Sequence, residues 1–220
     1  MKTPLPPPKP KMRGVFHAAA AVGSLIAGIF LLLKAPESAD HEHATFAIFV
    51  YLISLVGLFV TSAIYHIPHW KPRARRWLRR MDHSAIFFLI AGTFTPIAYL
   101  ALPPESSRQL LWLIWAIAAV GIVKSLVWID APKWLVATLC LGMGWIAAPY
   151  VGALAPALGV SGLTLLGVGG LVYTLGAVAY ALKRPDPAPR WFGYHEIFHV
   201  LVIIGAGCHY AAIYGLSARV

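Results

Sequence analysis

The sequence predicts an all-α membrane protein, a bundle of seven transmembrane helices with a cytoplasmic N-terminus and a C-terminus outside. Of the 220 residues, 59% are hydrophobic and only 12% are charged, and the mean hydropathy is +0.72. A soluble domain has about 45–50% apolar and about 25% charged residues. The apolar residues fall into blocks of roughly 20, the length that a helix needs to cross a hydrocarbon core about 30 Å thick. An ordinary soluble fold is therefore excluded.

Residues 1–13 hold five prolines and four Lys or Arg, which predicts an extended cytoplasmic tail. Residues 14–220 form the transmembrane domain. Its first apolar block is too long for a signal-peptide core and has no small-residue cleavage site, so we expect it to remain as a span. Pro156, Gly159 and Gly162 separate the fifth span from the sixth, and merging these two would leave six spans and move the C-terminus to the other side. The predicted spans are 14–34, 44–69, 84–102, 109–130, 133–152, 160–183 and 195–216.

The distribution of basic residues predicts the orientation. With the N-terminus inside, the internal segments carry fifteen Lys and Arg and the external segments carry three, as the positive-inside rule requires. The net charge of +10 could also indicate a nucleic-acid partner. In a membrane protein it favours contact with anionic lipid headgroups instead, here through the region Arg73–Arg80. We therefore expect membrane lipid as a partner and no nucleic acid, while the oligomeric state stays open.

Other local features predict structure rather than chemistry. Cys140 and Cys208 lie inside apolar blocks and predict two buried, inert thiols. The external segment KAPESADHEHA ends in His41, Glu42 and His43, which we interpret as a solvated loop because adjacent residues there give poor tetrahedral geometry. The Gly-rich stretch 159–176 predicts close helix packing.

Five polar residues are expected at one depth near the inner surface. His66 lies close to the inner end of the second span, with Ser62 one turn earlier on the same face. Asp82 begins the third span from the inside. His195 and His199 begin the seventh from the same side, with the i, i+4 spacing that places both imidazoles on one helix face. Ionisable groups inside spans are costly and usually pair with one another or bind something.

Three imidazoles with an open fourth position are typical of a catalytic zinc site. We predict His66, His195 and His199 as Zn²⁺ ligands. Asp82 would act as general base or as an outer partner of a ligand, and Ser62 would donate a hydrogen bond to water or to a developing oxyanion. A fourth direct ligand from Asp82 would instead indicate a structural metal.

Each of these residues also has an ordinary interpretation when it is taken alone. Ser62 could bond its own backbone, His66 could be an interfacial histidine, and Asp82 could complement a helix N-terminus. Among the other histidines, His17 lies at a similar depth and is a candidate outer partner. His69 and His83 are expected to be solvated at the interface, and His209 is expected to lie off the ligand face.

The motifs RGVFH (13–17), SAIYH (62–66), RARRWLRRMDHSAIFFLIAGTFTP (73–96) and HEIFH (195–199) resemble the haemolysin III family, bacterial members of the progestin and adiponectin receptor superfamily. The resemblance runs from Arg13 to about Tyr214. It implies a seven-helix bundle with the N-terminus inside and zinc at the cytoplasmic side. We expect the protein in a bacterial inner (plasma) membrane. The superfamily's SxxxH, Asp and HxxxH motifs match Ser62 with His66, Asp82, and His195 with His199.

The resemblance and the depth of the site favour a zinc-dependent hydrolase of a lipid amide or ester, similar to the related alkaline ceramidases. Two alternatives stay open. One is a non-enzymatic lipid sensor or membrane-homeostasis factor with a structural metal. The other is a cytolysin, as the family name suggests, although the spans lack the amphipathic character of a soluble pore former.

Overall fold

The structure is a computed structural model that describes residues 10–34 and 41–219. Over these two ranges the chain is helical apart from its loops, and one isolated bridge joins Ala188 to Phe192. The predicted all-α class is confirmed. The elements are α1 (Val15–Leu32), α2 (His41–His66), α3 (Pro72–Ala101), α4 (Pro104–Val127), α5 (Lys133–Gly144), the 3₁₀ helix η1 (Ala148–Tyr150), α6 (Val151–Leu182) and α7 (Tyr194–Ser217).

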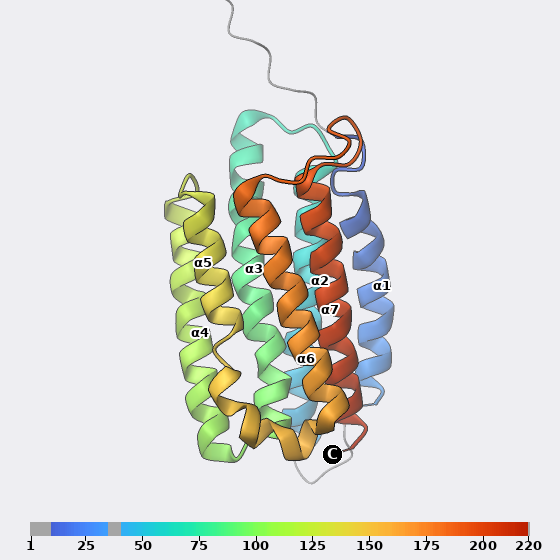
Figure 1. The fold of residues 1–220 in the computed structure, drawn as a ribbon, viewed down its shortest axis with the longest axis vertical. Coiled ribbons are helices and arrows are strands. Elements are labelled where there is room, and N and C mark those ends of the chain that lie inside the picture. Colours follow the sequence, from blue (N-terminus) through green and yellow to red (C-terminus); the bar gives the residue numbers. More distant parts are fainter. Residues whose placement is uncertain (1–9, 35–40, 220) are drawn as a thin grey trace, which may run out of the picture.

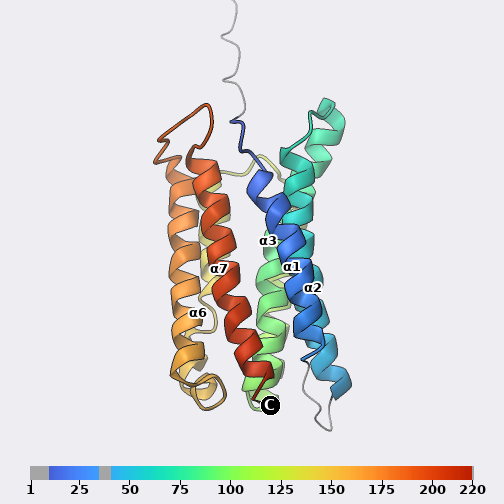
Figure 2. The ribbon, with the colours of Figure 1, turned by 90° about the vertical axis from the view of Figure 1, so that its right-hand side faces the viewer.

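The helices form an elongated bundle in which successive helices run in opposite directions (Figure 1). Turned by 90°, the bundle shows α6 and α7 on one side and α1 and α2 on the other, with α3 between them (Figure 2). Buried apolar residues of α2 and α3, among them Tyr51, Phe59, Phe87 and Ile97, form much of the core. The first turns of α1 and the last turns of α7 lie at opposite ends of the bundle (Figure 1).

The outer surface of the bundle suits a lipid environment. Large apolar side chains such as Phe30, Phe46, Val120 and Leu182 are exposed to the surroundings. By length and composition, six helical stretches of the described chain could cross a membrane, and the stretch Lys133–Leu182 counts among them as one. The chain is therefore a membrane protein with several apolar helices.

The stretch Lys133–Leu182 contains the largest departure from the predicted spans. A continuous helix over 133–152 is wrong, because α5 ends at Gly144 after 12 residues, about 18 Å of helix. Gly142 and Gly144 weaken the helix, and Pro149 follows in η1. Gly159 then breaks α6 with a φ of 63°. Figure 1 shows the first turns of α6 lying across the end of the bundle before the rest runs back alongside α5.

Prolines explain two helix ends near the predicted site. Helix α2 stops at His66 because Pro68 disfavours a helical conformation at Ile67. Helix α3 begins with Pro72 in its first turn, where a missing N–H costs nothing. The basic residues 73–80 therefore form the start of α3, which is twelve residues longer at this end than predicted.

Two predicted segments lie partly outside the described residues, namely the tail 1–13 and the external loop 34–44. Of that loop, His41, Glu42 and His43 form the first turn of α2 instead of a loop. The close packing predicted for the Gly-rich stretch is present. A Cβ on Gly169 would lie 2.5 Å from the ring of His209 on α7. Cys140 and Cys208 are free and partly buried.

Candidate metal centre

Three histidines that are remote in the sequence meet at one end of the bundle. His66 is the last residue of α2, and His195 and His199 lie in the first two turns of α7. One ligand atom from each ring lies within 4.8 Å of the other two. The centroid of the His66 ring is 4.8 Å from that of His195 and 5.0 Å from that of His199. These three residues, which we call the histidine triad, could hold a metal ion.

The spacing and burial of the triad fit a bound cation. Nε2 of His66 lies 3.2 Å from Nε2 of His195. Two nitrogens that each lie about 2.0–2.1 Å from one tetrahedral zinc ion are roughly 3.3 Å apart. Nδ1 of His199 is buried and finds no hydrogen-bond partner within the described part of the chain. A buried polar atom of this kind costs free energy unless a ligand contacts it or orients its ring.

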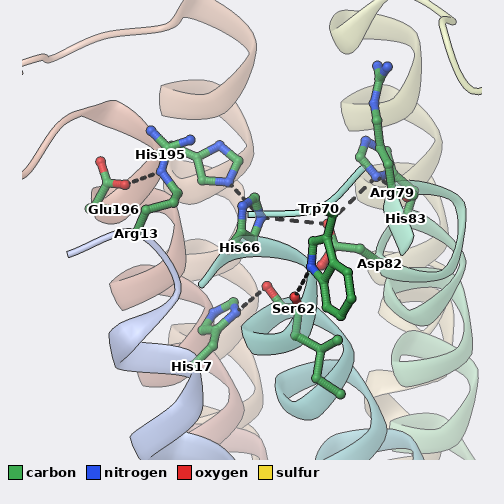
Figure 3. Close-up of polar contacts among 11 residues, drawn as sticks. Arg13, His17, Ser62, His66, Trp70, Arg79, Asp82, His83, His195 and Glu196 are labelled. Atoms are coloured by element: carbon green, nitrogen blue, oxygen red, sulfur yellow. Dashed lines mark hydrogen bonds and ion pairs between the residues drawn. The ribbon is translucent and has the colours of Figure 1, made fainter. Parts of the chain in front are cut away.

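Asp82 and Ser62 lie beside His66 (Figure 3). Oδ2 of Asp82 is 3.8 Å from Nε2 of His66, and the Ser62 side chain hydrogen-bonds the Asp82 carboxyl. Ser62 is 2% exposed, and its Oγ lies 2.8 Å from Nδ1 of His17. In an arrangement in which His17 donates to Ser62 and Ser62 donates to Asp82, the serine hydroxyl acts both as acceptor and as donor.

The five residues predicted from the sequence are thus brought together by α2, α3 and α7. Among the described residues, the group with metal-ligand geometry consists of the three histidines, and Asp82 stands outside it. The Asp82 carboxyl lies close enough to the triad to contact an ion held there or a molecule bound to that ion.

His17 and Glu196 complete the surroundings of the triad. The His17 ring stacks on the His199 ring, with centroids 3.9 Å apart and planes 17° apart. Glu196, on α7 between two of the triad histidines, is 0% exposed and pairs with Arg13 (Figure 3). Sequence reasoning gave Glu196 no role. The signal for it was an acidic residue inside an apolar run, which requires a cationic partner.

The remaining histidines differ in part from expectation. His69 is exposed, as predicted. His83 is not solvated, since its side chain is 14% exposed and Nδ1 lies 2.9 Å from the carbonyl oxygen of Arg79. His209 lies off the triad, as predicted, and its Nε2 contacts the carbonyl oxygen of Leu166 at 3.3 Å.

An apolar cavity of about 140 Å³ lies inside the bundle, and two of the triad histidines, His195 and His199, are among its lining residues. At one end the cavity is lined by polar residues, namely His17, Ser62, Asp82, His195 and His199. On α7 the lining continues to His209, which is about 21 Å along the helix from His195. That distance is roughly two-thirds of a hydrocarbon core. The other lining residues come from α2, α3, α5, α6 and α7 and include Ile86, Leu89, Ile90, Phe94, Val136, Leu141, Tyr173, Ala177, Tyr180 and Val202.

Most of the chain matches a family of known proteins. Residues 7–210 match the family described as Haemolysin-III related. The chain belongs to this family. It is 31% identical over 194 residues to Hemolysin-3 of Bacillus cereus, which covers 87% of this chain and 84% of that protein.

Two further relatives of this chain show how widely the similarity extends. The Hemolysin-3 homolog of Bacillus subtilis (strain 168) is 29% identical over 201 residues, 90% of each chain. Heptahelical transmembrane protein 4 of Arabidopsis thaliana is 32% identical over 175 residues, 70% of this chain and 44% of that protein. The resemblance predicted from the motifs is thereby confirmed.

Proposed function

We propose that this Haemolysin-III protein is a zinc-dependent hydrolase that cleaves an amide or ester bond of a membrane lipid. One observation supports the proposal above the others. Three histidines with metal-ligand geometry lie beside a carboxyl, Asp82, and two of them, His195 and His199, line an apolar cavity together with that carboxyl. A lipid-binding protein would need only the cavity, and a protein with a structural metal would need only the ligands. An enzyme that cleaves a lipid needs both.

The donor set favours zinc. His66, His195 and His199 supply three nitrogen ligands, which suits Zn²⁺ better than the oxygen-seeking Mg²⁺ or Ca²⁺. A zinc ion held in this way polarises a carbonyl group and lowers the pKa of bound water to about 7. The proposal also rests on the open fourth position, because a closed structural site would have four protein ligands.

We assign Asp82 the role of general base. Its carboxylate would accept a proton from the attacking water and pass it to the departing amine or alcohol. The products would be a carboxylic acid and a free amine or alcohol. Ser62 holds Asp82 in place through its hydroxyl, and His17 holds Ser62 in turn. In this geometry the serine acts on the carboxyl, whereas an oxyanion role would require its hydroxyl to rotate away.

The cavity supports a substrate with an acyl chain. Its wall is largely apolar and runs along α7 away from the triad, so a chain lying in it would present its carbonyl end to Asp82 and the histidines. The buried apolar surface would supply binding free energy of about 25 cal/mol per Å². Ceramides and other acyl lipids with a carbonyl near the headgroup have the required shape.

We also propose seven spans with the N-terminus inside, in a bacterial plasma membrane. Helix α6 has a kink at Gly159, and its first turns lie across the end of the bundle (Figure 1). On this basis we count one crossing before Gly159, which includes α5, and a second crossing after it. The name of the Arabidopsis relative, Heptahelical transmembrane protein 4, agrees with that number. The basic-residue bias places the triad near the cytoplasmic surface.

The proposal predicts metal-dependent lipid cleavage that requires Asp82. Purified protein should contain close to one zinc per chain by elemental analysis and should release fatty acid from ceramide or another acyl lipid in a broad screen. The Asp82→Asn variant should keep its zinc and lose activity about 10²–10⁴-fold, the usual contribution of a general base. His199→Ala should lose both zinc and activity.

Asp130→Asn is the matched control. Asp130 is an exposed carboxylate on the α4–α5 loop, and it pairs with Arg79 of α3. It should keep both zinc and activity. Zinc that stabilises the fold while every lipid stays intact would contradict the hydrolase and identify a structural metal. Dye release from liposomes by the wild type, absent in His199→Ala, would favour the lytic activity that the name of the Bacillus cereus relative suggests.

A further inference from the structure

The short segment of residues just before α1 contacts the loop and the first turn of α7, the helix that carries His195 and His199. The backbone N–H of Lys11 donates to the carbonyl of Arg190 at 3.1 Å, and that of Met12 donates to the carbonyl of Trp191 at 3.3 Å. Nζ of Lys11 lies 4.0 Å from the centre of the Trp191 ring. These contacts tie the chain ahead of α1 to the loop that leads into α7.

Arg13 places a charge inside this contact. Its guanidinium donates from Nε to Glu196, whose side chain is completely buried. In the sequence of α7, Glu196 lies between His195 and His199. The second carboxylate oxygen of Glu196 accepts the N–H of Gly193 at 2.8 Å. Removing one member of a buried pair leaves an uncompensated charge, so this contact holds the first turn of α7 firmly against the segment.

Gly14 brings the same segment against α2. Its φ is 83°, and a Cβ added to it would lie 2.8 Å from Cβ of His66 and 3.3 Å from the backbone nitrogen of Ile67. Real Cβ atoms do not approach one another so closely. The backbone at Gly14 therefore lies directly on the residue that supplies the α2 ligand, and it can do so because glycine has no side chain.

His17, one turn further on, completes the set of contacts. Its Nδ1 lies 2.8 Å from Oγ of Ser62 on α2, and its ring stacks on His199 of α7. Arg13, Gly14 and His17 thus each contact a different part of the centre. Helix α1 packs against both α2 and α7, and these are the two helices whose histidines must meet.

We propose that residues 13–17 form a positioning segment that sets the distance from His66 to His195 and His199 and so determines how tightly the triad binds its metal. The inference rests on the proposed zinc site and adds to it a structural cause for metal affinity. Residues of this kind touch the ligands and not the metal. Loss of such outer partners typically lowers metal affinity about 10- to 100-fold.

Gly14→Ala is the most direct test, with Gly23→Ala as its matched control. Both substitutions add one methyl group to a glycine of α1 or its start, but a Cβ on Gly23 meets nothing within 4 Å. Zinc affinity is measured on purified, folded protein by competition with a chelator of known affinity. Gly14→Ala should bind zinc about 10- to 100-fold more weakly, and Gly23→Ala should bind it as the wild type does.

The Arg13–Glu196 pair gives a second test that does not depend on steric strain. Arg13→Gln and Glu196→Gln should each weaken zinc binding, and the double variant should weaken it by much less than the product of the two single effects, because both remove one contact. The exposed pair Glu105 and Arg108 on α4 serves as control. With Co²⁺ in place of zinc, the ligand-field absorption should shift in Gly14→Ala, Arg13→Gln and Glu196→Gln and stay unchanged in the control variants.

The outcomes separate this inference from the proposed function. A wild-type protein that binds no metal overturns both. A wild-type protein that binds zinc, with Gly14→Ala and Glu196→Gln binding it equally well and giving unchanged Co²⁺ spectra, overturns the positioning segment and leaves the hydrolase standing. Weakened binding in Gly14→Ala and Glu196→Gln with intact controls supports the segment even if no lipid is cleaved.

Discussion

Ser62 illustrates how much the surroundings of a residue decide its role. A serine in an apolar helix ordinarily bonds its own backbone, as Ser54 and Ser125 do here. Ser62 instead connects His17 on α1 with Asp82 on α3. Spacing along α2 showed that Ser62 shares a face with His66, but it could not show that a histidine from another helix reaches the same hydroxyl.

Replacing Ser62 by alanine should therefore cost more than replacing a serine that bonds only its own helix. We expect Ser62→Ala to lower the free energy of unfolding by about 1–3 kcal/mol, because His17 and Asp82 both lose a buried partner. Ser125→Ala is the control, since that buried hydroxyl contacts only the carbonyl of Gly121. Thermal unfolding in detergent measures both, and equal losses would show that Ser62 is an ordinary packing residue.

At the scale of elements, helix contacts depend on where small residues allow two backbones to approach. A Cβ on Gly121 of α4 would lie 2.3 Å from the ring of Phe87 on α3, whereas one on Gly167 of α6 would meet nothing within 4 Å. Both glycines lie in apolar helices, so composition does not distinguish them. The tertiary contacts do.

Alanine at these two glycines should have opposite effects. Gly121→Ala should destabilise the bundle by about 1–3 kcal/mol through overpacking against Phe87. Gly167→Ala should leave stability unchanged or raise it by up to about 1 kcal/mol, because alanine is the better helix former. Thermal unfolding of the two variants in the same detergent decides the matter, and a stable Gly121→Ala protein would contradict the described α3–α4 contact.

The start of α3 is a second element with a predicted partner. It extends beyond the neighbouring helices at the end of the bundle that holds the triad (Figure 2). Arg73, Arg76 and Trp77 are exposed there, and the Arg80 guanidinium lies 4.9 Å from the centre of the Trp77 ring. Exposed basic residues beside an exposed tryptophan are typical of a helix that meets lipid headgroups.

We propose that this basic end of α3 binds anionic headgroups. Adding phosphatidylglycerol to micelles should stabilise the wild type more than adding phosphatidylcholine does. The double variant Arg73→Gln, Arg76→Gln should lose about 1 kcal/mol of that difference for each charge removed. Arg108→Gln, an exposed arginine of α4, should behave as the wild type. Equal stabilisation of all three proteins by phosphatidylglycerol would refute the proposal.

At the scale of the whole molecule, the orientation in the membrane determines which compartment the triad faces. The first turns of α1 and α7, the triad and the basic start of α3 share one end of the bundle (Figures 1 and 2). The positive-inside rule predicts that this end faces the cytoplasm. This assignment connects the charge pattern with the depth proposed for the lipid carbonyl.

Single cysteines introduced into a Cys140→Ser, Cys208→Ser background test this orientation in intact cells. Asp130→Cys and Arg190→Cys should resist a membrane-impermeant thiol reagent until the cells are opened. Glu105→Cys, at the start of α4 on the opposite end, should react at once. Labelling of Arg190→Cys in intact cells would place the triad outside and remove the basis of the proposed topology.

The amino-acid sequence by itself determined the membrane class, most of the helix positions and the five residues of the candidate centre. It could do so because apolar blocks, charge bias and i, i+4 spacing are local properties of the chain. Only the tertiary structure decided that α5 ends early, that Asp82 stands outside the histidine triad, and that Arg13, Gly14 and His17 reach it. Those facts depend on which distant helices pack together, on a break at Gly159 and on close approaches that no local pattern records.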